Sequence, residues 1–191
     1  LHLCHHNLET IETTSTTSDT LLAEVCYAAK EEGASITRYH GKHQGTNHGT
    51  ASQLCTVLAR SFADIGDIIR GRDLFRGNPQ EKEKRDDLEK NLKTIFEKIH
   101  SGLTKNGAKD YYKDNDKKNF YRLREDWWTA NRDQVWKALT CHAHGTYFHA
   151  TCIDGNSKSQ AKDNCRCKKN DGKSETDQVP TYFDYVPQYL R

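Results

Sequence analysis

The feature that most constrains this chain is its set of seven cysteines, Cys4, Cys26, Cys55, Cys141, Cys152, Cys165 and Cys167. Leu, Ile, Val and Phe account for only 33 of the 191 residues, so the apolar core must be thin. A thin core gains from covalent cross-links, which favours an oxidising environment and a disulfide framework. The alternative is a cytosolic protein with metal-bound thiolates. Because the count is odd, at least one cysteine has its partner outside this fragment or carries a free thiol.

The composition indicates a folded chain rather than a disordered one. The apolar content lies below the roughly 20% that is associated with disorder. Disorder also needs a large net charge, and 29 basic against 27 acidic residues leave only +2. No apolar stretch approaches the ~20 residues that span a bilayer, so we expect no membrane insertion by this piece. The chain has no methionine and no signal-peptide pattern, and we therefore expect a fragment or a processed product.

The spacing of apolar residues predicts an all-α fold with helices longer than average. A Thr/Ser run before Asp19 indicates the cap of a first helix, whereas the glycine-rich stretch Gly33–Thr50 indicates a loop or a broken helix. A capping box begins the second helix at Thr50, and Asn78 followed by Pro79 begins the third. No alternating strand pattern is present in the sequence. The predicted helices cover Asp19–Glu32, Thr50–Gly71, Asn78–Leu103 and Asn119–Cys141.

Zinc-type ligands gather after the fourth helix, but their spacing fits a zinc site poorly. A Cys-x-Cys pair is not the usual Cys-x₂₋₄-Cys knuckle, and no His-x₃₋₅-His pair completes it in the usual order. We therefore expect disulfide cysteines with solvated or core histidines, and neither a metal nor another cofactor. The ligand types in question belong to Cys141, His142, His144, His149, Cys152, Cys165 and Cys167.

Motifs for catalysis are also missing from the sequence, so we do not expect an enzyme. There is no Gly-x-Ser-x-Gly, no phosphate-binding glycine loop and no His-Glu-x-x-His. Asp64 and Asp67 are three residues apart and share one helix face, which resembles a carboxylate pair. Acidic residues on a helix surface are usually solvated, and we expect these two to be solvated as well.

Basic residues are more informative, because they concentrate in two segments. Residues 79–124 hold 13 Lys or Arg against 9 Asp or Glu, and residues 155–175 hold 6 against 3. Basic surfaces attract polyanions through their summed field and through ion release. The alternative is a mixed, solvated helix face without a ligand. Nucleic acid is disfavoured as a partner, since no recognition motif accompanies the charge.

Four motifs along the chain carry a family resemblance. They are LARSFADIGDIIRG at Leu58–Gly71, LREDWW at Leu123–Trp128, VWKALTC at Val135–Cys141 and VPTYFDYVPQYLR at Val179–Arg191, and Leu1–Cys4 matches as well. Together they resemble a Duffy-binding-like domain. More narrowly, the chain is similar over its whole length to the N-terminal alpha class in the malarial erythrocyte membrane protein 1 family of variant surface antigens.

The resemblance implies a disulfide-linked bundle of long helices arranged in subdomains. Residues 1–17 would end the first subdomain, residues 18–178 would form the helical second subdomain with its variable loops, and residues 179–191 would enter the third. It also implies display on the extracellular face of the infected erythrocyte membrane, anchored by a transmembrane segment outside this fragment. The implied partners are host red-cell or endothelial receptors, acidic glycans such as heparan sulfate in rosetting, and neighbouring domains of the same ectodomain.

Two function hypotheses follow from the resemblance. In the first, the chain is an adhesion module that binds acidic glycans through its basic surface. Lys105, Lys109 and Lys113 would share one side if their segment is helical. In the second, the chain is a structural or antigenic segment, and receptor binding resides in neighbouring domains. The candidate glycan-binding residues are Lys90, Lys93, Lys98, Lys105, Lys109, Lys113, Arg166, Lys168 and Lys169.

The resemblance also suggests cysteine pairs and core residues. Shorter Duffy-binding relatives have counterparts of Cys55 and Cys152 but lack those of Cys26 and Cys141, so the expected pairs are 55–152 and 26–141. Cys4 would then pair upstream, and Cys165 and Cys167 would pair within the third subdomain. Gly66 would permit close helix packing, and the expected core residues are Ile65, Ile69, Trp127 and Trp136.

Overall fold

The computed structural model describes residues 17–44, 51–74, 77–113, 119–147, 149–169, 171 and 175–191. It confirms the all-α class, with one short hairpin that the sequence did not predict. The helices are α1 (Ser18–Gln44), α2 (Ala51–Arg70), α3 (Pro79–Ser101), α4 (Ala108–Tyr111) and α5 (Tyr121–Leu139). Strands β1 (Cys152–Asp154) and β2 (Ser157–Ser159) pair in antiparallel fashion, and the 3₁₀ turns η1 (Phe183–Tyr185) and η2 (Gln188–Leu190) close the chain.

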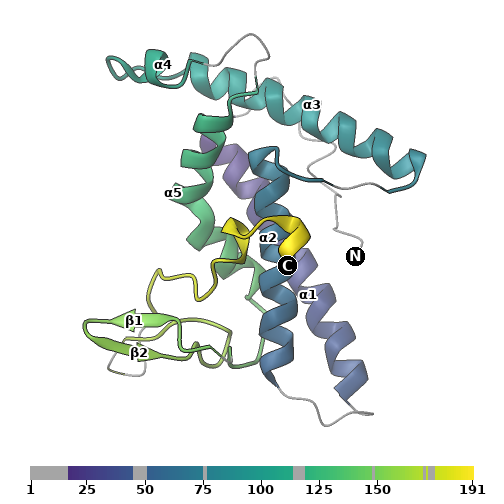
Figure 1. Ribbon diagram of the computed structural model, residues 1–191, viewed down its shortest axis with the longest axis vertical. Helices are drawn as coiled ribbons and strands as arrows, with labels where there is room; N and C mark the ends of the chain where they lie inside the picture. The colour runs from purple at the N-terminus through teal and green to yellow at the C-terminus, as the bar shows by residue number, and fades with distance from the viewer. Residues whose placement is uncertain are drawn as a thin grey trace.

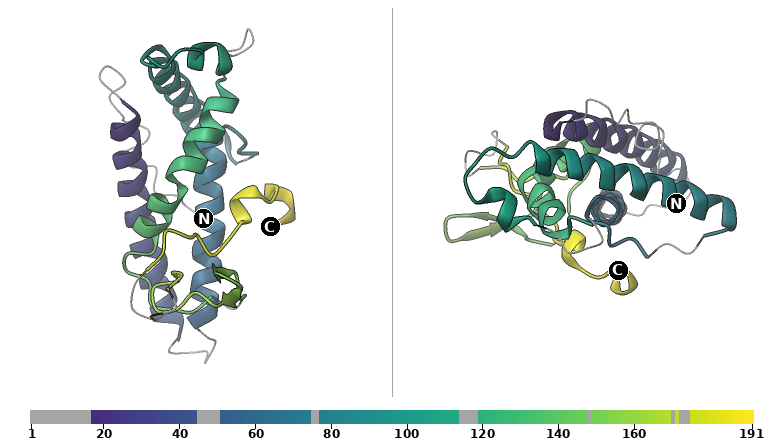
Figure 2. Two further views of the ribbon diagram at one scale, coloured as in Figure 1. Left: turned by 90° about the vertical axis from the view of Figure 1, so that its left-hand side faces the viewer. Right: turned by 90° about the horizontal axis from the view of Figure 1, so that it is seen from above.

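Three of the helices lie side by side and form the body of the molecule. In Figure 1, α1 and α5 run in the same direction, and α2 runs in the opposite direction. Helix α3 crosses one end of this bundle and continues into α4, whereas the β1–β2 hairpin lies at the opposite end, as the views of Figure 2 also show. None of the helices in the described ranges combines the length and the apolarity that crossing a bilayer requires.

Local sequence signals set the beginnings of α1 and α3 as expected. The Thr17 hydroxyl accepts a hydrogen bond from the Thr20 amide at 3.3 Å, which caps α1. The Asn78 side chain accepts a hydrogen bond from the Glu81 amide at 2.8 Å, and Pro79 occupies the first turn of α3. The predicted start of α2 at Thr50 lies outside the described residues.

The first helix corrects one prediction, because it continues through Gly33 to Gln44. Glycine usually weakens a helix interior, and this suggested a break. Here the glycine is needed for packing: a Cβ atom on Gly33 would lie 1.8 Å from the Leu139 carbonyl oxygen at the end of α5. At the other end of the same contact, Trp127 Nε1 donates to the Ser18 hydroxyl at 3.0 Å. These two contacts confirm that α1 and α5 run parallel.

The predicted core residues are buried in the structure. Ile65, Ile69, Trp127 and Trp136 all belong to one apolar cluster that includes residues of α1, α2, α3 and α5. Gly66 permits close packing as expected, since a Cβ atom there would lie 2.8 Å from Trp128 Cζ2. The cluster also contains Cys55, Cys152, Cys165 and Cys167.

Buried charges join the helices at two places that the sequence did not reveal. The fully buried Arg124 of α5 donates to the carbonyl oxygens of Ile69 at 2.5 Å and Ile68 at 3.0 Å, at the end of α2. Its remaining N–H groups bind both oxygens of Glu89 on α3, each at 2.8 Å. This arrangement supplies a donor to the helix-end carbonyl of Ile69 and a second donor to that of Ile68, which also accepts from the Gly71 amide at 3.1 Å.

The second buried site fixes the C-terminal segment. The Asp184 carboxylate accepts hydrogen bonds from Trp128 Nε1 at 2.9 Å and from Arg132 Nε and Nη2 at 2.8 Å each. The Asp184 carbonyl oxygen accepts a further hydrogen bond from Arg70. Four donors around one residue hold the chain end against α2 and α5.

The expectation that Asp64 and Asp67 are solvated is wrong. Asp67 is buried and pairs with Arg70 at 2.9 Å and with Arg191, while Asp64 pairs with Arg191 at 3.3 Å. Burial raises the pKa of both carboxyl groups, although Arg191 opposes that rise. Both carboxylates therefore have structural partners. The division at residues 17 and 178 into subdomains stays a prediction.

The contact of Gly33 with α5 gives a direct stability test. Gly33→Ala places a methyl group against a backbone oxygen that cannot rotate away, so α1 and α5 must separate. We expect the free energy of unfolding to fall by about 2–3 kcal/mol in a urea titration. The matched control is Gly102→Ala at the end of α3, where a Cβ atom would make only ordinary contacts at 3.5 Å. Equal stability of the two variants would contradict the tight packing at Gly33.

Candidate functional site

The nine candidate glycan-binding residues fall into two groups at opposite ends of the bundle. Lys90, Lys93 and Lys98 lie on α3, and Lys105, Lys109 and Lys113 follow in and around α4. The other three residues, 166, 168 and 169, lie in the loop that follows β2. Figure 1 shows α3 and α4 at one end and the hairpin with its following loop at the other. The structure therefore does not bring the nine residues together into one surface.

Acidic neighbours already engage two of the candidate lysines. Lys93 lies 4.0 Å from Glu89, and Lys168 pairs with Asp163. The hydrogen bond from Lys168 and its positive charge lower the pKa of the Asp163 carboxyl group. An ammonium group that is already paired with a carboxylate attracts an external anion less strongly.

Arg166 has a structural role that the sequence did not suggest. Its guanidinium donates to the Lys137 carbonyl oxygen at 2.8 Å, to the Thr140 hydroxyl at 3.0 Å and to Glu175 at 2.7 Å. These contacts attach the loop after β2 to the end of α5. We conclude that Arg166 holds the loop in place rather than offering its donors to a ligand.

The prediction that Lys105, Lys109 and Lys113 share one side required a continuous helix. The segment around α4 is not a continuous helix. Helix α4 has only four residues, and it begins after Gly107, whose φ of 77° requires a left-handed turn. Lys105 precedes this turn and Lys113 follows the helix. The i, i+4 argument therefore fails, although the three lysines stay within one short segment.

Contacts to α3 and α5 nevertheless fix the α4 segment. A ring nitrogen of His100 lies 3.0 Å from the Lys109 carbonyl oxygen. The Tyr112 hydroxyl donates to Asp126 at 2.9 Å, and Arg122 Nη1 donates to the Tyr111 carbonyl oxygen at 3.2 Å. The segment is therefore attached to the body of the molecule on both sides.

The basic end of the molecule is best defined by four residues, which we call the α3–α4 lysines: Lys98, Lys105, Lys109 and Lys113. Between residues 98 and 113 the only carboxylate is Asp110. Lys105, Lys109 and Lys113 are exposed, and Lys98 is half-buried. Within the described part of the chain, no carboxylate forms an ion pair with any of the four.

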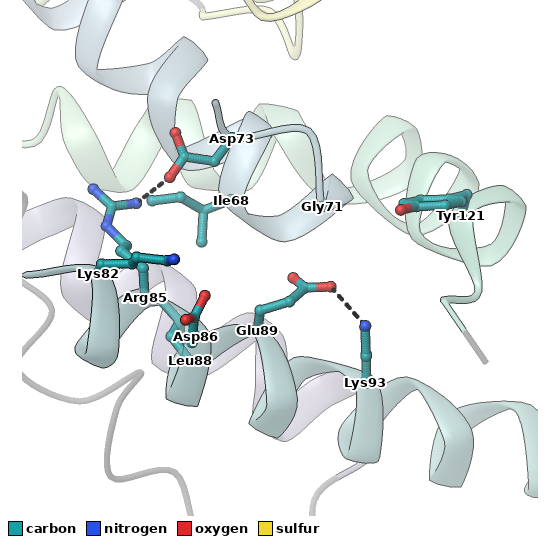
Figure 3. Close-up of a pocket in the computed structure, with 10 residues that line it drawn as sticks. All are labelled: Ile68, Gly71, Asp73, Lys82, Arg85, Asp86, Leu88, Glu89, Lys93 and Tyr121. Atoms are coloured by element: carbon teal, nitrogen blue, oxygen red, sulfur yellow. Dashed lines mark hydrogen bonds and ion pairs between the residues drawn. The ribbon is translucent and has the colours of Figure 1, made fainter. Parts of the chain in front are cut away.

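A pocket of about 310 Å³ lies nearby, between α3, the end of α2 and the start of α5 (Figure 3). Its charges largely compensate one another. Arg85 pairs with Asp73 at 2.7 Å, and Glu89 faces Lys93 in addition to its bonds with Arg124. This pocket offers an anion less net charge than the α3–α4 lysines do.

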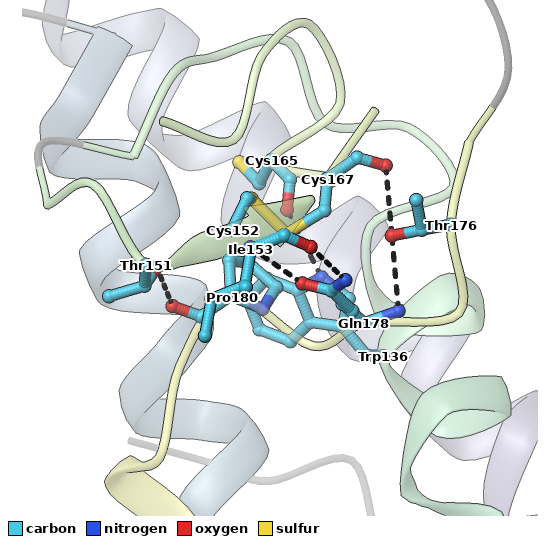
Figure 4. Close-up of a disulfide and its surroundings, with 9 residues drawn as sticks. All are labelled: Trp136, Thr151, Cys152, Ile153, Cys165, Cys167, Thr176, Gln178 and Pro180. Carbon is cyan, nitrogen blue, oxygen red and sulfur yellow. Dashed lines mark hydrogen bonds between the residues drawn. A yellow bond between two sulfur atoms is a disulfide. The ribbon is translucent and has the colours of Figure 1, made fainter. Parts of the chain in front are cut away.

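The disulfides differ from the expected pairs. Cys55 is bonded to Cys165 and Cys152 to Cys167, so the prediction 55–152 is wrong. Figure 4 shows the reason: the chain folds back after β2 and brings Cys165 and Cys167 against the bundle, rather than leaving them to a third subdomain. Trp136 Nε1 fixes this return by donating to the Cys165 carbonyl oxygen at 3.1 Å.

The predicted pair 26–141 is also wrong, since both cysteines are free thiols. The parallel packing of α1 and α5 explains this. Leu139 lies beside Gly33, and Cys141 follows Leu139 by only two residues. Cys26 precedes Gly33 by seven residues, which is about 10 Å along α1, so the two cysteines lie at different levels of the bundle. Cys26 instead lies near Asp133: burial first, and then the Asp133 charge, raise the pKa of its thiol to about 11. Cys4 lies outside the described residues.

The zinc-type ligands do not form a metal site in the described ranges. No three His, Cys, Asp or Glu side chains there cluster so as to hold a metal ion. Cys152, Cys165 and Cys167 are oxidised in disulfides and cannot act as thiolate ligands.

With the bundle, the disulfides and the basic end established, comparison with known proteins identifies the family. The profile of the Duffy binding domain family matches residues 1–191. The chain belongs to the Duffy binding domain family. A search of curated proteins gave no match.

Solved structures of the Duffy binding domain family share the fold. The NTS-DBL1α1 domain of the Plasmodium falciparum membrane protein 1 (PfEMP1) from the varO strain is 38% identical, with a TM-score of 0.76 over 99% of this chain and 40% of that chain. The NTS-DBL1α and CIDRγ double domain of the same strain is 39% identical, with a TM-score of 0.75 over 99% of this chain and 25% of that one. An ICAM-1-binding PfEMP1 DBLβ domain is 31% identical, with a TM-score of 0.69 over 100% of this chain and 39% of that one. This Duffy binding domain chain therefore spans 40% or less of these relatives.

The thiols of this Duffy binding domain provide a chemical test of the corrected pairing. Peptide mapping without reduction should recover the links 55–165 and 152–167. Iodoacetamide at pH 8 should label the exposed Cys141 rapidly and the half-buried Cys26 slowly, because a pKa near 11 leaves about one thiol in a thousand ionised. Labelling of Cys26 in 6 M guanidinium is the control, and a recovered 26–141 peptide would contradict the structure.

Proposed function

We propose that this Duffy binding domain is an extracellular adhesion module of the alpha class of PfEMP1, displayed on infected red cells and anchored outside this fragment. The 38% and 39% identity to two DBL1α structures supports the class. The adhesion role is supported by related domains, since one DBLβ relative is an ICAM-1-binding domain. Our proposal includes neither catalysis nor a bound cofactor or nucleic acid.

The ligand class that we propose is an acidic glycan of the heparan sulfate kind, as in rosetting. The observation that carries this is the set of α3–α4 lysines, whose ammonium groups are not neutralised by carboxylates of the described residues. Sulfated glycans are flexible polyanions, so several modest ionic contacts suit them better than one deep pocket. The helix α3 and the contacts of α4 hold these charges at one end of the bundle.

The second candidate function is a structural or antigenic segment, with receptor binding in neighbouring domains. The observation that favours it is coverage: the chain corresponds to 40% or less of the solved domains that it resembles. Residues of those domains beyond the matched part could then supply the receptor contacts. The two candidates differ in whether this chain alone binds a polyanion.

A heparin titration over a salt series separates the two candidates. The fourfold variant Lys98→Glu, Lys105→Glu, Lys109→Glu and Lys113→Glu should lose most of its affinity. Each ionic contact contributes about one unit to the slope of log K against log salt, so the slope should fall by up to about 4. Isothermal calorimetry at several salt concentrations measures both quantities.

A matched control variant has the same change in net charge, but the replaced residues lie elsewhere on the surface. Lys30, Arg38, Lys158 and Lys162 are exposed residues away from α3 and α4, and their replacement by Glu should leave heparin binding within about twofold of the wild type. Red-cell binding of both variants is measured in parallel. Full binding by the α3–α4 variant would disprove the proposed surface, and no heparin binding by the wild type would favour the antigenic role.

A further inference from the structure

Among the α3–α4 lysines, one aromatic ring is exposed and yet rigidly held. The Tyr111 side chain is 55% exposed. Its ring meets the Tyr112 ring edge-on, with centroids 4.8 Å apart and planes at 84°. The Arg122 guanidinium lies over the ring, with Cζ 4.7 Å from the centroid, and it also donates to the Tyr111 carbonyl oxygen. Two side chains and one backbone contact thus fix a ring that solvent still reaches.

The support beneath this ring comes from α5. Tyr112 is half-buried and packs against the apolar core, and its hydroxyl donates to Asp126. This hydrogen bond raises the pKa of Tyr112, so the phenol stays protonated and keeps its place. Arg122 and Asp126 are four residues apart on α5 and hold the two tyrosines from one helix face. The aromatic pair is therefore built on a rigid element rather than on a loose loop.

The surroundings of the ring carry an excess of positive charge. Lys109 belongs to the same four-residue helix, and Lys105 and Lys113 flank that helix. Asp126 is engaged by the Tyr112 hydroxyl, and Asp110 is the single carboxylate of the segment. An exposed aromatic ring with Arg122 over it and three lysines in the same short segment suits a ligand that is flat and apolar at its centre and anionic at its edge.

We propose that Tyr111 is a stacking subsite for one pyranose ring of a sulfated or carboxylated glycan, and that Arg122 and the adjacent lysines bind the acidic groups of that sugar. This rests on the proposed function, and it adds the residues that distinguish a sugar from a simple polyanion. The apolar C–H face of the pyranose covers the tyrosine ring. Arg122 keeps N–H donors beyond the one that it gives to Tyr111, and a guanidinium binds a sulfate or carboxylate through paired donors.

Other exposed tyrosines differ in their surroundings. Arg132 lies over the rings of Tyr182 and Tyr185, 5.7 and 5.2 Å from their centroids, but its guanidinium is paired with Asp184. Tyr27 and Tyr39 lie on α1 and are 52% and 62% exposed. Among the described residues, no arginine is stacked on the Tyr27 ring, and neither tyrosine belongs to the basic segment of α3 and α4. Tyr121 lines the pocket of Figure 3, where the charges compensate one another. Tyr111 is thus distinguished by its rigid support and by its charge together.

The test compares two polyanions, a size-defined heparin oligosaccharide and linear polyphosphate, which has no sugar ring. Tyr111→Ala should weaken heparin binding about five- to tenfold, in keeping with the energy of an aromatic contact. The slope of log K against log salt should not change, because no ionic contact is lost. Polyphosphate binding should stay at the wild-type value. Tyr111→Phe, which retains the ring, should bind heparin as the wild type does, and Tyr27→Ala is the control for loss of an exposed tyrosine.

Each result has a definite meaning. If Tyr111→Ala binds heparin normally while the fourfold lysine variant does not, the stacking subsite is wrong and the proposed function stands. If Tyr111→Ala weakens polyphosphate as much as heparin, Tyr111 acts by placing the lysines, and stacking is again wrong. If the wild type binds neither polyanion, the proposed function and this inference fail together. Thermal unfolding of every variant verifies that the fold is retained.

Discussion

The arrangement of the helices depends on the buried guanidinium of Arg124. It satisfies two carbonyl groups at the end of α2 and both carboxylate oxygens of Glu89, and so connects three helices through one side chain. Its positive charge also suits the negative end of the α2 dipole. Space for it comes from Gly71, where a Cβ atom would lie 2.9 Å from Arg124 Nη1. Removing Glu89 would leave the buried guanidinium without its carboxylate partner, which destabilises the fold.

This interaction matters for the candidate surface because α3 crosses the bundle instead of packing along it. Helix α3 is held against the bundle by the Arg124–Glu89 pair and by four buried apolar residues, Leu88, Leu92, Ile95 and Phe96. Phe96 meets Trp127 of α5 edge-on, with the ring centroids 6.1 Å apart. The position of the α3–α4 lysines is thus determined by contacts in the core, while the lysines themselves lie toward solvent. A surface of this kind can change its side chains without disturbing its support.

The sequence predicted what depends on near neighbours and missed what depends on distant ones. Caps such as Asn78 and the apolar stripes are local signals, and the helices follow them closely. Gly33 looked like a helix break because the group that requires a glycine there, the Leu139 carbonyl, lies 106 residues away in the chain. Asp67 looked solvated for the same reason, since Arg191 comes 124 residues later. The basic end was found from composition, but Gly107 turns the chain there and no spacing rule reveals how the lysines then lie.

The disulfide from Cys55 to Cys165 has a consequence for the order of events during synthesis. Its two cysteines are 110 residues apart, and Cys141 and Cys152 leave the ribosome before Cys165 does. At about 5–20 residues per second, Cys55 waits roughly 5–20 s for its native partner, while Cys4 and Cys26 are already present and Cys141 and Cys152 follow. A bond between Cys55 and any of these cysteines must be exchanged before the native pair can form, and the rate of that exchange then limits how fast the bundle is cross-linked.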